Sequence, residues 1–385
     1  MKDPVGTTAP DPLGPPAHEQ HWVDLVRDLA AGFAATAADH DANSTLPIEN
    51  LRALHASGLD AALLPKEFGG QDLSYRSYGQ ITRLLSAACP STACIWVMHI
   101  GAAVGLVTMS ETDVARFYAE ELIRGKRFAN ALSEPSGGNL FLMPQQHAIP
   151  VEGGYRLDGA KRFCSGCEVA DHFLVNALVD GIPTFFGVAA DESMSFVPIW
   201  DTMGLRASRS QLIDFQNTLL RGDRRCPPPS VRRPNHIGAG LAFLSLGVAD
   251  AALDALIDHA RSRTIPTTGA PLADMQWLRF ALAEVHTDLV AAGTLAQHMC
   301  WLADVNDVDF IPATVRAKVL ANRVAKGAAQ LALEAGGGSA YLKTSPIERI
   351  FRDAQAGHLM AYSAEVCKGM IAEGLLGAPE GDRHG

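Results

Sequence analysis

The sequence predicts an α+β fold in which a β-domain lies between two helical domains, and three observations support this order. Residues 21–127 are rich in Ala and Leu with only short breaks, which is typical of packed helices. Residues 131–225 hold short β-prone runs separated by turn residues. Beyond residue 229, apolar residues recur at three- and four-residue spacing. We therefore expect a disordered tail (1–20), a helical domain (21–130), a β-domain (131–232) and a helical bundle (233–385).

The N-terminal region shows no sign of export or of membrane insertion. Prolines are frequent in the first 16 residues, and the basic-then-apolar pattern of a secretion signal is missing. The best apolar run, 95–107, is interrupted by His99 and is shorter than the roughly 18 residues that a membrane span needs. We expect a cytoplasmic protein that does not bind membranes.

The later elements are predicted by the spacing of apolar residues. In the β-domain, strands are expected around 155–157, 172–178, 184–188 and 212–215. After the three prolines at 227–229, one apolar face follows 246–260 and another follows 275–289. These faces predict long helices that pack side by side.

Composition excludes several classes of function. The formal net charge is −10 and no run is rich in Lys or Arg, so nucleic acid is not expected as a partner. The seven cysteines are scattered and odd in number, which favours reduced thiols. Cys164 and Cys167 form a CxxC without a second pair or a nearby His, so we interpret them as structural and expect no metal. The motifs of serine hydrolases, zinc proteases, P-loop enzymes and Rossmann enzymes are missing.

Four blocks of sequence, taken in order, resemble motifs of the acyl-CoA dehydrogenase family. Residues 132–139, LSEPSGGN, are similar to (S/T)EPxxGS, and residues 154–166, GYRLDGAKRFCSG, are similar to GYxLxGxKxW(I)(S/T)N. Residues 203–210, MGLRASRS, are similar to GMRxTxS. Residues 336–354 are similar to the GGxGY…P…RxxRDA block. The resemblance covers about residues 20–375.

This resemblance implies a fold, a cofactor and an assembly. The family has an N-terminal helical domain, a central β-barrel-like domain and a C-terminal four-helix bundle, and it usually forms a homotetramer that holds FAD. We expect a homotetramer or at least a homodimer. The cofactor-binding residues that the resemblance implies are Leu132, Ser133, Phe163, Cys164, Ser165, Arg263, Gln276, Gly337, Gly338 and Ser363.

The residue types in this set agree with a flavin site. Phe163 is an apolar wall for a flat ring, and Ser133 and Ser165 are donors for its polar edge. The alternative is that the two serines only satisfy turn backbones. Pro266 and Glu334 stand where the family has an aromatic residue and Gln. These departures leave FMN open beside FAD.

The catalytic base of the family is missing from its usual positions. The glutamate seven residues after the RDA motif aligns with Ala361, and the alternative position, near the start of the bundle, aligns with Ile237. Glu365 is a displaced candidate. Removal of an α-proton needs a positioned base, so ordinary acyl-CoA dehydrogenation is not the expected reaction.

The leading hypothesis is a flavin-dependent oxidation that uses O₂, of the monooxygenase type, with a CoA or carrier-protein thioester or a small aromatic or carbonyl compound as substrate. Family members without the glutamate include monooxygenases, in which reduced flavin reacts with O₂, and a separate flavin reductase is a candidate partner. His99 and His358 are the candidate catalytic donors, against the alternative that each is a satisfied core residue. Two further hypotheses stay open: an acyl-CoA or acyl-carrier-protein dehydrogenase with a displaced base, and a non-catalytic subunit that binds flavin or acyl thioester.

Overall fold

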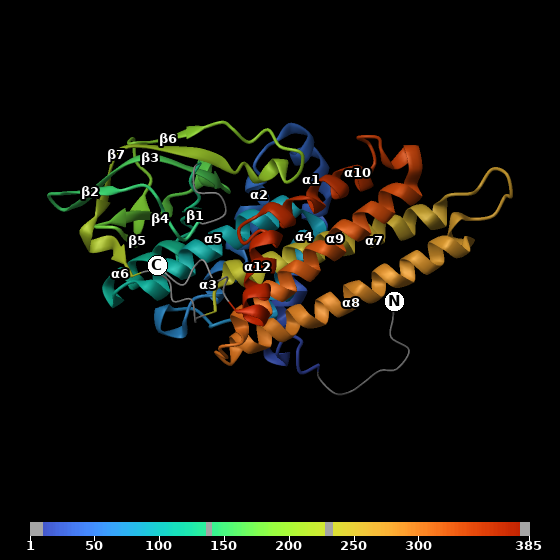
Figure 1. The fold of residues 1–385 in the computed structure, drawn as a ribbon, viewed down its shortest axis with the longest axis horizontal. Helices are drawn as coiled ribbons and strands as arrows, with labels where there is room; N and C mark the ends of the chain where they lie inside the picture. The colour runs from blue at the N-terminus through green and yellow to red at the C-terminus, as the bar shows by residue number, and fades with distance from the viewer. Residues whose placement is uncertain (1–10, 136–140, 228–233, 378–385) are drawn as a thin grey trace.

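A computed structural model describes residues 11–135, 141–227 and 234–377 of the chain. It confirms the predicted order of a helical domain, a β-domain and a second helical domain (Figure 1). The β-domain lies at one end of the molecule, and the long helices α7 (His236–Ser262), α8 (Gln276–Asp304) and α9 (Phe310–Ala340) extend away from it. The functional site is expected where these parts meet.

The N-terminal domain is built around one buried helix. Helix α5 begins with Pro90 at a position where its missing N–H costs nothing, and nearly all of its side chains are buried. Ser74 caps helix α4 through the N–H of Ser77. The helices of this domain are α1 (Gln20–Asn43), α2 (Ile48–Ala56), α3 (Leu59–Ala62), α4 (Tyr75–Ala88), α5 (Pro90–Met109) and α6 (Thr112–Ile123).

The segment before α1 contacts the domain, although we expected it in a disordered tail. The Arg76 guanidinium donates a hydrogen bond to the Pro12 carbonyl at 3.0 Å. The buried carboxylate of Glu19 accepts hydrogen bonds from Ser74 and Ser77. The expected tail therefore corresponds at most to residues 1–10, which lie outside the described residues.

The β-domain consists of two four-stranded sheets, with strand orders β1-β4-β5-β8 and β2-β3-β7-β6. A cluster of buried residues that includes Phe173, Phe186 and Phe215 fills its core. All four predicted strands lie within observed ones. The strands are β1 (Phe128–Ala131), β2 (Ala148–Val151), β3 (Gly154–Cys164), β4 (His172–Val179), β5 (Ile182–Ala189), β6 (Met194–Val197), β7 (Gln211–Arg221) and β8 (Arg225–Cys226).

Strand β1 lies in a region that we assigned to the helical domain. It is only four residues long, and it pairs in parallel with β4 from Phe128 to Ala131. A run this short has no periodicity of its own, so its strand conformation comes from the neighbouring strand. The last residue of β1 directly precedes the 132–139 motif and therefore sets its position.

The C-terminal domain confirms both predicted apolar faces. Leu246, Ala249, Leu253, Leu256 and Ala260 are buried on α7, and the second face is buried on α8 at Leu278 and Leu289. The helices are α7 (His236–Ser262), α8 (Gln276–Asp304), α9 (Phe310–Ala340), α10 (Pro346–Ala354), α11 (Ala356–Leu359) and α12 (Ala364–Leu376).

Two helices are long and apolar enough to cross a membrane, which differs from the sequence-based expectation. These helices are Pro90–Met109 and His236–Ser262. In each, 72% of the apolar window is buried inside the protein. Burial of this kind is typical of core helices, which pass the same test of length and composition.

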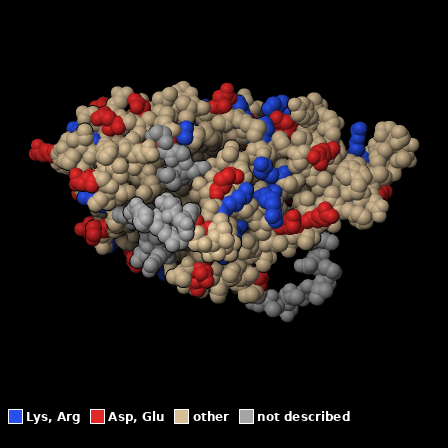
Figure 2. All heavy atoms as spheres, viewed as in Figure 1, with Lys and Arg blue, Asp and Glu red and all other residues tan. Residues whose placement is uncertain are grey.

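Charged residues of both signs are interspersed on the face of the molecule shown in Figure 2. Many of the exposed charges are paired with a near neighbour in the sequence, as Arg124 is with Glu120 and Arg221 is with Asp223. Exposed pairs of this kind contribute little to stability. The seven cysteines, in contrast, are all buried free thiols, as expected from their number and spacing.

Candidate active site

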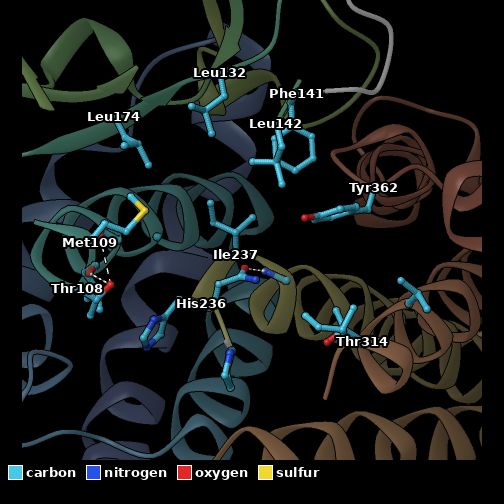
Figure 3. Close-up of a pocket in the computed structure, with 18 of the residues that line it drawn as sticks. Thr108, Met109, Leu132, Phe141, Leu142, Leu174, His236, Ile237, Thr314 and Tyr362 are labelled. Carbon is cyan, nitrogen blue, oxygen red and sulfur yellow. Dashed lines mark hydrogen bonds between the residues drawn. The ribbon is translucent and has the colours of Figure 1, made fainter. Parts of the chain in front are cut away.

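Two adjoining cavities lie where the three domains meet. The first has a volume of about 400 Å³ and lies between the end of β3, the segment 200–205 and the segment 352–361. The second has a volume of about 700 Å³ and lies between α5, the start of α7, α9 and α12 (Figure 3). Leu132, Phe141 and Ile237 line both cavities and therefore form the boundary between them.

A chain of buried hydroxyl groups lines one side of the first cavity. The Oγ atoms of Ser165 and Ser210 lie 2.8 Å apart, and those of Ser208 and Ser210 lie 2.9 Å apart. The Cys94 thiol extends this chain, with its Sγ 3.7 Å from Ser165 Oγ. Burial raises the pKa of the Cys94 thiol to about 11, so the thiol is neutral at physiological pH. The first cavity therefore offers neutral hydrogen-bonding groups along this side.

The lining of the first cavity also includes aromatic rings and unpartnered polar atoms. The rings of Phe163 and Trp200 meet edge to face with their centroids 6.0 Å apart. Arg162 Nε and Asn130 Oδ1 are buried without a hydrogen-bond partner among the described residues. A flavin ring system is flat, largely apolar and polar along one edge. An aromatic wall with an unused donor and an unused acceptor fits such a ring.

The structure brings four of the predicted cofactor residues together at the first cavity. Leu132, Ser133, Phe163 and Ser165 all line it. Cys164 does not, because its side chain is buried in the β-domain core. The contact expected of Cys164 was through its backbone, and this stays a prediction.

Ser363 also lies outside the lining of both cavities. It precedes α12, where its Oγ accepts a hydrogen bond from the Val366 N–H at 3.4 Å and so caps the helix. The side chain is buried. A contact between Ser363 and a cofactor stays a prediction.

The remaining predicted cofactor residues form a separate group at the far end of the helical bundle. Arg263 follows α7, Gln276 begins α8, and Gly337 and Gly338 lie near the end of α9, where Gly337 takes φ +57° in a kink. The buried residues of these helix ends belong to one cluster. The four residues are exposed and line neither cavity, so their predicted contact with a flavin requires a neighbouring subunit.

Several residues of the first cavity were not among the predicted site residues. Arg162, Ser208 and Ser210 lie inside the matched motif blocks, so their position in those motifs could have identified them as site residues. Asn130 and Trp200 lie outside those blocks. They reach the cavity because β1 and the segment after β6 end there, and nothing in their local sequence shows this.

The two positions at which the family places its base both lie at this site. Ala361 lines the first cavity, and Ile237 lies at the boundary. Ile237 packs directly on Gly101 of α5, where an added Cβ would lie 2.3 Å from Ile237 Cγ1. Neither position carries a carboxylate, as the sequence indicated.

His99 lies away from both cavities, which removes the positional support for its predicted catalytic role. Its Nδ1 accepts a hydrogen bond from the Phe128 N–H at 2.9 Å, and its Nε2 lies 3.4 Å from Asp60 Oδ2. Asp60 also accepts hydrogen bonds from Trp96 and Arg127. Burial lowers the pKa of His99 and keeps the ring neutral. The residue therefore belongs to a buried polar network between the N-terminal domain and β1.

His358 and Glu365 contact each other at the surface rather than in a cavity. His358 Nε2 lies 3.1 Å from Glu365 Oε1, and the Glu365 side chain is 64% exposed. Lys368 contacts the same carboxylate at 3.6 Å. Glu365 lines neither of the two cavities between the domains. The position of Glu365 therefore does not support a displaced base, although the neighbours of His358 line the first cavity.

The second cavity has mostly apolar walls and a few polar groups that the sequence did not single out. His236 is buried with its ring stacked on Tyr75 at 4.7 Å, and burial lowers its pKa to about 4. Lys318 is 1% exposed, and its Nζ donates a hydrogen bond to the Gly357 carbonyl at 2.9 Å. Burial lowers the pKa of Lys318 to about 8. The polar groups of this cavity are therefore neutral or cationic.

A buried ion pair holds the boundary residue Phe141 in place. The Phe141 carbonyl accepts a hydrogen bond from Asn176 Nδ2 at 2.7 Å, and Asn176 Oδ1 accepts one from Lys161 Nζ at 2.9 Å. Lys161 also pairs with Glu134 at 2.7 Å, and both side chains are buried. Glu134 accepts hydrogen bonds from the backbone of Gln145 at the far end of the loop. Glu134, which belongs to the 132–139 motif, therefore supports the boundary between the two cavities.

Comparison with protein families identifies the class to which this arrangement belongs. The acyl-CoA dehydrogenase N-terminal domain matches residues 16–126, and the acyl-CoA dehydrogenase C-terminal domain matches residues 235–376. The chain belongs to the acyl-CoA dehydrogenase family, a family of flavin-dependent oxidoreductases that bind FAD. The resemblance found in the sequence is confirmed.

Curated relatives match the chain along nearly all of its length. A 3-(aryl)acrylate reductase of Clostridium sporogenes is 28% identical, covering 93% of this chain and 99% of the relative. A 3-sulfinopropanoyl-CoA desulfinase of Paraburkholderia xenovorans is 27% identical, covering 90% of this chain and 92% of the relative. These relatives carry out different reactions, so membership of the family does not specify one.

Solved structures show the same fold. Butyryl-CoA dehydrogenase from Megasphaera elsdenii matches with a TM-score of 0.87 and 21% identity, covering 96% of this chain and all of that one. FMN-bound TdsC from Paenibacillus sp. A11-2 matches with a TM-score of 0.83 and 21% identity, covering 92% and 97% of the two chains. At these identities the likeness concerns the fold.

Proposed function

We propose that this chain is a flavin-dependent oxidoreductase that uses O₂ in a monooxygenase-type oxidation of a CoA thioester or a small aromatic or carbonyl compound. One observation carries the proposal. Among the described residues that line the two cavities, none is Asp or Glu. Desaturation of an acyl thioester by the usual route requires a carboxylate that removes the α-proton, and an oxygenation does not.

In this proposal, residues of the first cavity bind the flavin and residues of the second cavity bind the substrate. In the first cavity, the hydroxyls of Ser165 and Ser210 would hold the polar edge of a flavin, and Phe163 would cover part of its apolar surface. In the second cavity, apolar walls bind the substrate and exclude water from it. The boundary residues Phe141 and Ile237 determine where the two ligands meet.

The overall reaction balances with one reductant and one oxidant. One oxygen atom of O₂ enters the substrate and the other leaves as water, with the two electrons supplied by reduced flavin. No described residue near the cavities replaces that reductant, so we expect a separate flavin reductase or another electron donor as partner.

The proposal includes FAD as the flavin and a homotetramer or homodimer as the assembly. Arg263, Gln276, Gly337 and Gly338 lie together at an exposed end of the bundle, and the family binds FAD. The exposed side chains of Trp277 and Tyr341, 53% and 78% accessible, lie at the same end. Large exposed apolar side chains are a mark of an interface. A second subunit placed there brings Arg263 to its partner's flavin.

The proposal is tested by two experiments on the purified flavoprotein. In the first, the oxidised enzyme is mixed anaerobically with saturated acyl-CoA esters, and the flavin absorbance is expected to persist. In the second, the chemically reduced enzyme is exposed to ¹⁸O₂ with a panel of thioesters and aromatic ketones, and the product is expected to carry one labelled atom. Rapid anaerobic bleaching by a saturated acyl-CoA, with no label in the product under air, would show a dehydrogenase instead.

A further inference from the structure

Tyr362 takes a backbone conformation that large side chains normally avoid. Its φ is +54°, in the left-handed region that favours glycine. A residue in that region costs free energy unless the surrounding structure imposes it, and such residues gather at functional sites. Tyr362 follows Ala361, so the chain is strained at the point where it passes from the first cavity to the second.

The strained backbone directs the phenol of Tyr362 into the second cavity. In Figure 3, the side chain extends from the segment between α11 and α12 toward the centre of the cavity, and its hydroxyl points toward Ile237. No described residue forms a hydrogen bond with this hydroxyl. The hydroxyl is therefore available to a ligand in the cavity, and a ligand acceptor there can replace the hydrogen bond that water supplies.

Contacts on both sides hold the Tyr362 side chain in this orientation. Its ring meets the ring of Phe141 edge to face, with centroids 4.9 Å apart and an angle of 81° between the planes. Its backbone carbonyl accepts a hydrogen bond from Cys367 Sγ at 3.3 Å. The following residue, Ser363, caps α12. The hydroxyl therefore has a fixed position, which a group that orients a ligand requires.

We propose that the Tyr362 hydroxyl is a specificity-determining group that donates a hydrogen bond to the carbonyl oxygen of the substrate. The hydroxyl is a neutral donor, since burial raises the pKa of Tyr362 further above the physiological range. A neutral donor in an apolar cavity selects an uncharged acceptor on an otherwise apolar body. The inference rests on the proposed function. Within that function, it implies that the enzyme binds carbonyl compounds and thioesters in preference to hydrocarbons.

The test compares ligands that differ only in the carbonyl group. The probes are butyryl-CoA against the thioether S-butyl-CoA, and acetophenone against ethylbenzene. Binding to the oxidised holoenzyme is measured from the shift in the flavin absorption spectrum. Wild type is expected to bind the carbonyl member of at least one pair about tenfold more tightly, the effect of one hydrogen bond. Tyr362→Phe is expected to bind both members of that pair equally, at the affinity of the weaker one.

Two further variants make the result specific. Tyr75→Phe removes another phenol from the lining of the same cavity and is expected to keep the carbonyl preference. Tyr362→Gly removes the hydroxyl while accommodating φ +54°, so it gives the same loss of preference if the Phe variant fails to retain flavin.

Three outcomes would overturn the inference. These are a wild-type enzyme that does not discriminate within either pair, a holoenzyme that binds no member of either pair, and a Tyr362→Phe variant that keeps the full preference. The measurement needs neither O₂ nor turnover. It therefore tests the carbonyl preference independently of the incorporation of labelled oxygen.

Discussion

The first and second cavities share three lining residues yet are built from different kinds of sequence. The first is lined mostly by residues from the short motif blocks and their neighbours, with neutral hydroxyls from Ser165, Ser208 and Ser210, and helices α5 and α7 add only Cys94, Met98 and Ile237. The second is lined mostly by apolar residues, and many of them belong to α4, α5, α7, α9 and α12, which lie far apart in the sequence. A cofactor site can therefore be recognised from local patterns, whereas a substrate site depends on how helices pack.

The largest expected effect comes from breaking the support of the boundary between the cavities. Lys161→Met leaves Glu134 as a buried carboxylate without its cation, and unpairing a buried charge costs about 3–5 kcal/mol. We expect the free energy of unfolding in urea to fall by that amount, with Phe141 released. As a control, Lys126→Met breaks the exposed pair with Asp171 and should change stability by less than about 1 kcal/mol. Equal effects of the two substitutions would show that the buried pair does not support the boundary.

The second prediction concerns the cation at the substrate side. The folded-state pKa of Lys318 is lowered from 10.5 to about 8, so between these values the unfolded chain binds more protons than the folded chain. Stability from this lysine is therefore present above pH 10.5 and is lost as pH falls to 8, by about 3 kcal/mol at most. Lys318→Met should remove this dependence, as measured by urea unfolding from pH 7 to 9.5. Parallel pH profiles of the variant and the wild type would contradict the prediction.

The third prediction tests whether Arg263, which lines neither cavity, contacts the cofactor. If Arg263 contacts the pyrophosphate of FAD in a neighbouring subunit, as proposed, Arg263→Ala removes a charge-assisted contact that contributes about 1.5–3 kcal/mol. FAD binding should weaken tenfold or more, while FMN binding, measured by the same fluorescence titration, should change little. A similar loss of both flavins would assign Arg263 to the fold rather than to the ligand.

The smallest expected effect tests the hydroxyl chain of the first cavity. Ser165→Ala removes one neutral hydrogen bond and should weaken flavin binding by about 0.5–1.5 kcal/mol. Ser193→Ala, which removes a β-domain hydroxyl that pairs with Thr218 at 2.7 Å, provides the matched control. If both variants bind flavin equally well, Ser165 only links Ser210 to Cys94 and does not contact the cofactor.

The fold could be predicted from the sequence because its main elements have a clear periodicity. The apolar faces of α7 and α8 were visible at helical spacing, and all four predicted strands were found. Strand β1 could not be predicted, because Phe128–Ala131 is too short to show a pattern and depends on β4 for its partner.

The site could be predicted only in part, for the same physical reason. Phe163 and Ser165 belong to a strand end that a motif fixes, and the structure places both at the first cavity. His99 stands on a helix whose sequence does not show which way the side chain points, and in the core its Nδ1 accepts a hydrogen bond from the Phe128 N–H while its Nε2 faces Asp60. No sequence pattern indicated a role for Tyr362, because a positive φ at a tyrosine follows from the surrounding packing rather than from local sequence.

The lack of a side chain at Gly101 limits how this lineage can diverge. A larger residue there would push Ile237 into the boundary and separate the two cavities, because the added Cβ would lie 2.3 Å from Ile237 Cγ1. A large side chain can therefore be accommodated at position 101 or at position 237, but not at both. A descendant that regains a carboxylate at 237 has to retain glycine at 101, and among close homologues these two positions should covary although they lie on different domains.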